Sequence, residues 1–103
     1  MIYHKLVRDK IPQIIAQKGG KSETRILAED EYRICLEAKL DEEVGEYHRD
    51  KTPEELADIL EVVYALAEAN GCSKQQLLQI YEKKHHDRGG FADRIFLISS
   101  EEG

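Results

Sequence analysis

Apolar residues recur in the middle of the chain at the three- and four-residue spacing of an amphipathic helix. They fall at Tyr32, Leu36, Leu40, Val44 and Tyr47. This spacing places all five side chains on one face of a helix, with polar and charged residues around the rest. The pattern predicts a long helix from about residue 30 to about residue 48 that buries a single apolar stripe.

A second amphipathic helix is predicted directly after it. Thr52 is an N-cap residue type, Pro53 occupies the first helical position, and Glu55 stands at the capping-box position. One face of this helix is mostly apolar and consists of Leu56, Leu60, Val63, Leu66, Ala67 and Asn70. Gly71 predicts the end of the helix, because glycine readily adopts the left-handed conformation that terminates helices.

Two shorter helices flank this pair. The later one opens with a second capping box, Ser73 and Gln76, and is expected to end at Gly89-Gly90. The earlier one is expected to begin with Asp9 as its N-cap and to continue to about Gln17.

The tail has a different pattern. Residues 94–98 are rich in β-prone side chains and predict a short strand, which can pair with either residues 2–7 or residues 24–27. Helices pack best in groups of four around shared apolar stripes, and the helices of one chain do not close a good core. We therefore expect an all-α single domain over residues 1–103, with a short β element from the termini. Its bundle would be completed by a two-fold homodimer or a larger homo-oligomer.

Composition and charge restrict the functional class. The 103 residues are 41% hydrophobic and 35% charged, and no apolar run approaches the roughly 20 residues of a membrane span. The first residues do not resemble a signal peptide, so we expect a cytoplasmic protein with no membrane partner. The net charge of −6 argues against DNA or RNA as a partner, because nucleic-acid binders carry a positive footprint. A single nucleotide remains open as a ligand if metal ions mediate its phosphate contacts.

Two pairs of carboxylates are the main chemical feature. Glu43 and Glu46 are three residues apart on the first long helix, and Glu55 and Asp58 are three apart on the next. Residues at this spacing are neighbours on one helix face. If the helices are antiparallel neighbours, the four carboxylates converge, and two charges about 4 Å apart repel by about 4 kcal/mol at an effective dielectric of about 20. Such a cluster takes up protons or a cation, and an all-oxygen donor set selects a hard cation such as Mg²⁺.

Plainer roles stay open for the same residues. Glu55 also serves as a capping-box residue, and Glu43 can pair with Lys39 one helical turn earlier. A zinc site is disfavoured, because His85 and His86 are adjacent and point about 100° apart on a helix.

The segment Glu42-Glu43-x-x-Glu46 followed by Glu55-x-x-Asp58 resembles the EExxE…ExxD signature of the MazG-like all-α nucleoside triphosphate pyrophosphohydrolases. Lys39, the Glu55–Leu60 run and the Gly71–Ser73 helix start extend the similarity to phosphoribosyl-ATP pyrophosphohydrolase of histidine biosynthesis.

Both ends of the chain carry further similarity. Lys5–Pro12 and Arg88–Phe91 resemble the small branch of this superfamily whose members are usually labelled phosphoribosyl-ATP pyrophosphohydrolase-like. The resemblance implies a MazG-like helical bundle, assembly as a dimer or larger, and dependence on Mg²⁺, with Mn²⁺ as the alternative. It also implies cleavage of a nucleotide between its α- and β-phosphates, to give a nucleoside monophosphate or a phosphoribosyl-AMP-like product and diphosphate.

The resemblance also implies roles for individual residues. By position, the metal ligands would be Glu43, Glu46, Glu55 and Asp58, and Glu42 would either hold a ligand in place or orient the attacking water. Either Glu42 or Glu43 would act catalytically by accepting the proton of a water whose pKa the metal lowers.

Basic side chains are expected to offset the charge that develops on the phosphates. The candidates for substrate binding are Lys39, Arg8, Lys10, Lys84 and Arg88. A different functional class remains open beside the enzyme: a non-catalytic helical module, regulatory or partner-binding, that retained the fold.

Overall fold

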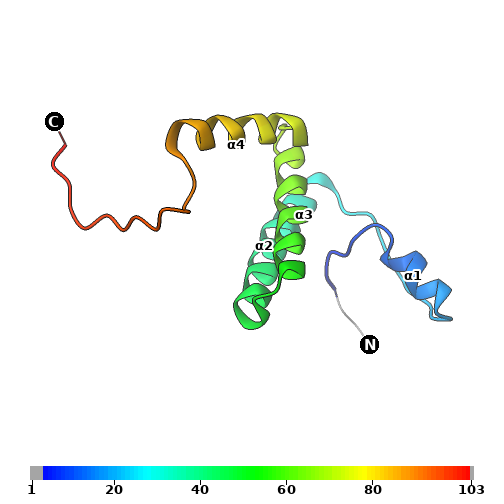
Figure 1. Ribbon diagram of the computed structural model, residues 1–103. Coiled ribbons are helices and arrows are strands. Elements are labelled where there is room, and N and C mark those ends of the chain that lie inside the picture. The colour runs from blue at the N-terminus through cyan, green and yellow to red at the C-terminus, as the bar shows by residue number, and fades with distance from the viewer. Residues whose placement is uncertain (1–3, 103) are drawn as a thin grey trace.

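The structure is a computed structural model that describes residues 4–102, and it contains four helices and no strand within that range. The helices are α1 (Ile11–Gln17), α2 (Glu29–Asp50), α3 (Pro53–Ala69) and α4 (Lys74–Arg88) (Figure 1). The all-α fold class is thus confirmed for the described residues. None of the helices there is long and apolar enough to cross a membrane.

The helices α2 and α3 form an antiparallel hairpin, which is the centre of the structure (Figure 1). Two residues separate them: Lys51 adopts a left-handed φ of 52°, and Thr52 caps α3 by accepting a hydrogen bond from Glu55 N to its Oγ1 at 3.4 Å. Pro53 begins α3 as predicted. Because this turn is so short, the end of α2 lies beside the start of α3.

The ends of α3 and α4 also follow the sequence signals. Ser73 N donates to Gln76 Oε1 at 2.8 Å, and Gln76 N donates to Ser73 Oγ at 3.1 Å, so the predicted capping box is confirmed. Just beyond the two helices, Gly71 and Gly89 have φ of 85° and 78°. These positive angles disfavour a side chain and favour glycine.

The predicted N-cap of α1 is wrong. Asp9 lies within a turn that is closed by a hydrogen bond from Ile11 N to Arg8 O at 3.0 Å. The N-cap position therefore falls on Lys10, which forms no side-chain cap bond. The predicted end of α1 at Gln17 is confirmed.

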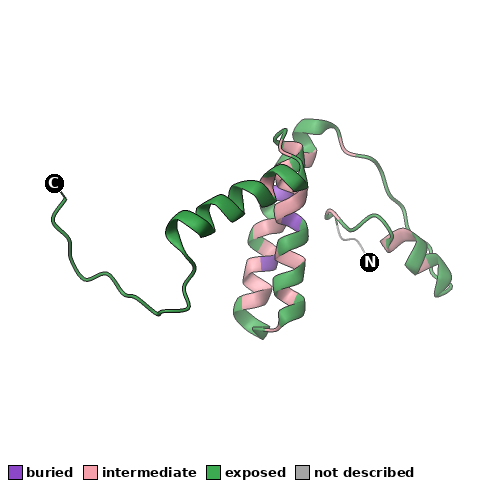
Figure 2. Cartoon of the chain, turned by 45° about the horizontal axis from the view of Figure 1, so that its top comes forward, coloured by how far each residue is buried: buried purple, intermediate pink, exposed green. Residues whose placement is uncertain are grey.

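The core of the single chain is small. Among the described residues, its buried apolar side chains are Leu36 on α2 and Val62 on α3, which are 3% and 7% exposed. Figure 2 shows that partly buried residues concentrate on the α2–α3 hairpin, whereas α4 and the tail are exposed. The radius of gyration is 18.2 Å, well above the roughly 13 Å of a compact chain of this length. One chain therefore does not enclose the four-helix bundle that the sequence predicts.

The strand expected at residues 94–98 is not found in the described residues. After Gly89 and Gly90 the chain leads away from the hairpin (Figure 1), so no neighbouring strand can receive its backbone hydrogen bonds. Of the two segments expected to pair with it, residues 24–27 are not in a strand. In the other segment, residues 2 and 3 lie outside the described residues.

Candidate metal centre

Four carboxylates converge at the turn of the hairpin. Glu43 and Glu46 come from the last two turns of α2, and Glu55 and Asp58 come from the first two turns of α3. One oxygen atom from each side chain can be chosen so that the four atoms all lie within 4.8 Å of one another. The structure thus brings together the two pairs that the sequence predicts as metal ligands.

Two of these side chains place an oxygen where no donor reaches it. Glu43 is 6% exposed, and its Oε2 is buried without a hydrogen-bond partner. Glu55 Oε2 is also buried and unpartnered, although the backbone N–H of Glu55 donates to the capping hydroxyl of Thr52. A buried carboxylate oxygen without a partner is unfavourable by several kcal/mol unless a proton or cation compensates it. Four anionic oxygen donors suit a hard divalent cation such as Mg²⁺ or Mn²⁺.

The environment of the cluster raises the pKa of two carboxyls. The pKa of Glu43 is raised by burial first and by the neighbouring charge of Glu46 second, while Lys39 partly opposes the shift. Burial also raises the pKa of Glu55, and Glu46 and other nearby carboxylates raise it further. Without an ion, Glu43 and Glu55 therefore hold their protons more tightly than isolated glutamic acid side chains would.

Lys39 connects the cluster with the predicted water-orienting residue. Its Nζ lies 3.4 Å from Glu43 Oε1 and 3.4 Å from Glu42 Oε2. The i,i+4 pair that the sequence left open is therefore present, and it coexists with the cluster rather than replacing it. Glu42 is only partly buried and stands beside the four converging oxygens, not among them.

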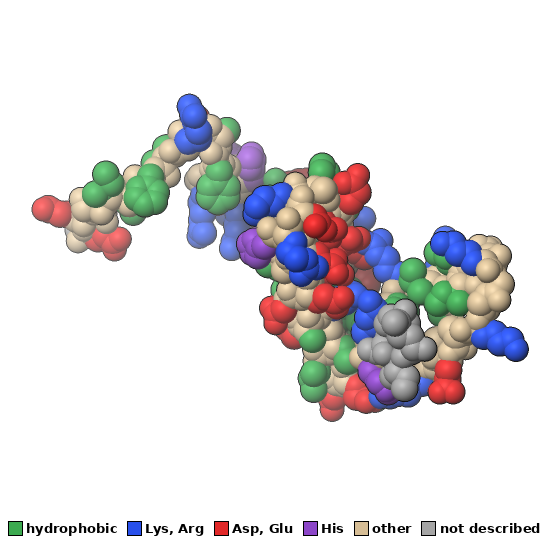
Figure 3. Space-filling model, turned by 90° about the horizontal axis from the view of Figure 1, so that it is seen from below, with side chains coloured by type: hydrophobic (Ala, Val, Ile, Leu, Met, Phe, Trp, Pro, Cys, Tyr) green, Lys and Arg blue, Asp and Glu red, His purple; other side chains and the backbone are tan. Residues whose placement is uncertain are grey.

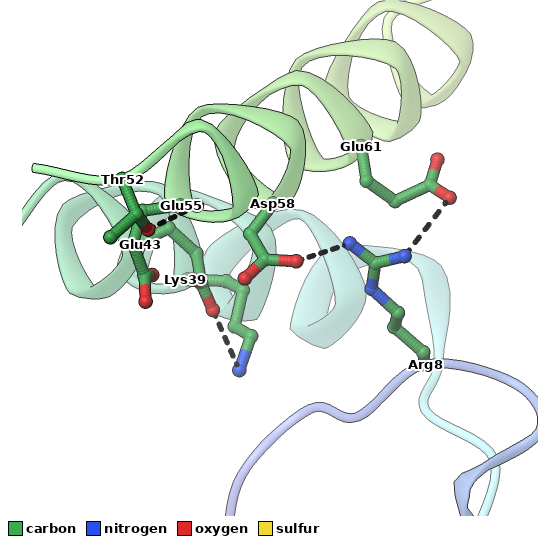
Figure 4. Close-up of polar contacts among 7 residues, drawn as sticks. All are labelled: Arg8, Lys39, Glu43, Thr52, Glu55, Asp58 and Glu61. Atoms are coloured by element: carbon green, nitrogen blue, oxygen red, sulfur yellow. Dashed lines mark hydrogen bonds and ion pairs between the residues drawn. The ribbon is translucent and has the colours of Figure 1, made fainter. Parts of the chain in front are cut away.

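Arg8 reaches the cluster from a segment 50 residues away in sequence. Its Nη2 donates to Asp58 Oδ1 at 2.6 Å, and its Nη1 lies 3.8 Å from Glu61 Oε1 (Figure 4). The guanidinium thus occupies one edge of the acidic cluster. The sequence analysis did not identify Glu61, although it stands one turn beyond Asp58 on the same helix face.

A groove of about 300 Å³ opens beside the cluster. One wall is the segment 6–9, and the other consists of side chains from α2 and α3. The lining is Leu6, Val7, Arg8, Asp9, Tyr32, Leu36, Lys39, Glu43, Asp58, Glu61, Val62, Ala65 and Glu68. This volume is at the lower end of small-molecule sites. The lining combines apolar side chains with the two cations Arg8 and Lys39 and with five carboxylates, of which Glu43 and Asp58 belong to the cluster.

The other three basic candidates lie elsewhere. Lys10 is exposed at the start of α1. Lys84 and Arg88 are exposed on α4, which leaves the hairpin at the end opposite the α2–α3 turn (Figure 1). Within one chain, the structure does not bring these three side chains to the carboxylates.

Divalent ions are expected to raise the melting temperature, and to raise it more at pH 8 than at pH 5. The ligand carboxyls must be deprotonated to bind a cation, and the pKa values of Glu43 and Glu55 are raised. Without an ion, these two carboxyls contribute most to the stability of the fold below the ordinary pKa of a glutamic acid, where both are protonated. This contribution is lost as the pH rises through their raised pKa values. Differential scanning fluorimetry with Mg²⁺, compared with NaCl at matched ionic strength, measures the shift. Equal shifts with both salts would contradict a specific site.

Replacing Arg8 with Gln is expected to tighten the binding of bare Mn²⁺ several-fold, because a cation that competes for Asp58 is removed. The effect is modest, since both side chains are about half exposed and solvent screens their attraction. Calorimetric titration with Mn²⁺ measures it, and Lys18→Gln, an equal charge change at an exposed site, is the matched control. Weaker Mn²⁺ binding by the Arg8 variant would show that Arg8 organises the site instead of competing for it.

Comparison with known proteins yields a similar sequence in an uncharacterized protein of Mycolicibacterium smegmatis, which is 54% identical over 41 residues. The matched segment is 40% of this chain and 42% of that protein, so the match spans less than half of either. No family model matches the chain, and no solved structure matches it. The uncharacterized relative carries no description of an activity.

Proposed function

We propose that this chain is a Mg²⁺-dependent nucleotide pyrophosphohydrolase of the MazG-like type, which hydrolyses the bond between α- and β-phosphates and releases diphosphate. The observation that carries this proposal is the four-carboxylate cluster with two buried, unpartnered oxygens, at the side of a groove that also holds Arg8 and Lys39. The resemblance of the same carboxylates to the EExxE…ExxD signature supports it.

The carboxylates divide into holding and proton-accepting roles. Glu43, Glu46, Glu55 and Asp58 would hold the cation, which when bound supplies charge neutralisation and a water of lowered pKa. Glu42 stays outside the converging oxygens, and Lys39 contacts its Oε2, so its other oxygen would accept the proton of the attacking water. The water oxygen bonds to phosphorus as the anhydride bond breaks, and diphosphate leaves.

The groove would position the rest of the nucleotide. The accessible part of its apolar lining, which includes Leu6, Val7 and Tyr32, offers surface for the base and sugar. Arg8 lies at the rim of the cluster, and its guanidinium can pair bidentately with phosphate oxygens. Lys39 adds a second positive charge beside the same groove.

We also propose that the protein assembles as a homodimer. The chain exposes 9490 Å², whereas a compact monomer of 11.8 kDa exposes roughly 5,900 Å². The excess of roughly 3,600 Å² per chain is ample for an obligate dimer, whose interface buries roughly 2,000–5,000 Å² in total. Half-exposed leucines on α3 and the exposed Ile34 on α2 supply apolar surface for it.

A nucleotide panel with product identification tests the proposed activity. We expect diphosphate and a nucleoside monophosphate from at least one nucleotide in the presence of Mg²⁺, and no release after addition of EDTA. Absence of hydrolysis across the panel, together with no effect of divalent ions on melting, would contradict the enzyme. That result would favour the non-catalytic helical module.

A further inference from the structure

The segment 91–102, here called the C-terminal arm, presents a continuous apolar surface to solvent. Ile95, Phe96, Leu97 and Ile98 are 74–90% exposed, and Phe91 is more exposed still. The arm stands clear of the helices (Figures 1 and 3), and the backbone hydrogen bond found within it is local, from Arg94 N to Phe91 O. A contiguous run of exposed apolar side chains marks an interaction surface.

An open, shallow groove lies along one face of α4, from Cys72 to Lys83. Its lining is Cys72, Gln76, Gln79, Ile80 and Lys83. The groove thus combines apolar surface around Ile80 with a lysine at one end. It lies on the part of the molecule that has the least cover from its own chain (Figure 2).

The charges of the arm and of α4 are complementary. The arm carries Glu101 and Glu102 beyond its apolar run. The helix α4 carries an excess of positive charge in a chain whose net charge is −6, with Lys74, Lys83, Lys84 and Arg88 against Glu82 and Asp87. The pair Lys83–Asp87 is exposed, so this lysine remains available to a further carboxylate.

The dimensions also agree. From Phe96 to Glu101 an extended chain covers about 17 Å at about 3.3 Å per residue. From Cys72 to Lys83 the helix covers about the same distance at about 1.5 Å per residue. An arm with its acidic end at Lys83 therefore spans the whole groove and places Phe96 at Cys72 and Ile98 near Gln76.

We propose that the C-terminal arm of each chain lies in the α4 groove of a second copy. This inference rests on the two-chain assembly proposed above and specifies part of its interface. The arm leads away from its own α4 instead of returning along it (Figure 1), and a two-fold exchange buries both arms with one set of contacts. A second copy can cover the area that each chain leaves exposed.

The native Cys72 in the groove permits a direct test. In a Cys35→Ala background, a cysteine is introduced in turn by Ile95→Cys, Phe96→Cys, Leu97→Cys and Ile98→Cys, and the full-length protein is oxidised mildly. We expect at least one variant to form a disulfide-linked dimer on a non-reducing gel in more than half of its chains. Adding Cys72→Ser, the matched control, is expected to abolish that band.

Other outcomes overturn the proposal in distinguishable ways. A disulfide to Cys72 within one chain, identified by mass spectrometry of mixed isotope-labelled chains, would place the arm on its own α4. No disulfide to Cys72 in any variant, with a dimer in sedimentation, would refute the exchanged arm and leave the assembly standing. A wild-type protein that sediments as a monomer would refute both the exchanged arm and the homodimer. None of these measurements depends on nucleotide hydrolysis, so they test the arm independently of the proposed activity.

Discussion

Replacing Glu43 with Gln is expected to lower diphosphate release at least about 100-fold and, at the same time, to stabilise the ion-free protein. Glu43 is the most buried of the four carboxylates, and one of its oxygens has no partner in the protein. A neutral amide is a poor ligand for a hard cation, so the proposed metal-assisted hydrolysis would lose its most enclosed donor. The same neutral group removes a charge whose burial the fold disfavours, as the raised pKa of Glu43 indicates.

The pH dependence separates this effect from a general loss of folding. With EDTA present, the gain in melting temperature should be clear at pH 8 and should fade toward pH 4, where the wild-type carboxyl is itself protonated. Asp58→Asn should lose activity similarly, and Glu37→Gln, an exposed change on the same helix, should retain it. Full activity in both the Glu43 and Asp58 variants would show that the cluster takes no part in the reaction.

The hairpin and its carboxylates could be predicted because their signals are local. Thr52 and Pro53 fix the start of α3, and the two-residue turn then forces the end of α2 beside it. Once the two helices are antiparallel, the three-residue spacings of the acidic pairs bring their oxygens together without further information. The burial of Glu43 also follows, because it borders the apolar stripe that contains Leu36.

Features that depend on distant segments could not be predicted in the same way. No local pattern shows that Arg8 meets Asp58, because the contact is set by the path of residues 4–10 across the hairpin. The β-prone run at residues 94–98 reflects side-chain preference, but a strand requires a neighbour, and none is within reach in the described part of the chain. The prediction for Asp9 failed for a local reason, because the turn closed by the hydrogen bond from Ile11 N to Arg8 O moves the N-cap position to Lys10.

A single chain brings the carboxylate cluster together but does not complete the packing of its C-terminal part. The hairpin brings four carboxylates together, whereas α4 and the arm lack a core to pack against. Lys84 and Arg88 are remote from the four-carboxylate cluster of their own chain. In a two-fold assembly these cations could approach the groove beside the carboxylate cluster of the second copy. Arg88 could then contact a nucleotide there, as the family resemblance implies, although it is far from the cluster of its own chain.

A charge on the exposed face of α3 is expected to disrupt the proposed homodimer. Leu56 and Leu60 stand one turn apart on α3 and are 50% and 48% exposed, so Leu60→Glu is expected to weaken the dimer about 1,000-fold. Losing one buried leucine contributes about 2 kcal/mol, a buried charge adds to it, and two-fold symmetry applies the change twice. Sedimentation equilibrium measures the dissociation constant, circular dichroism checks helicity, and Leu60→Met, which keeps the apolar volume, should remain dimeric. If Leu60→Glu remained a tight dimer, this face of α3 would lie outside the interface, and the uncovered surface of α4 and the C-terminal arm would have to supply the association instead.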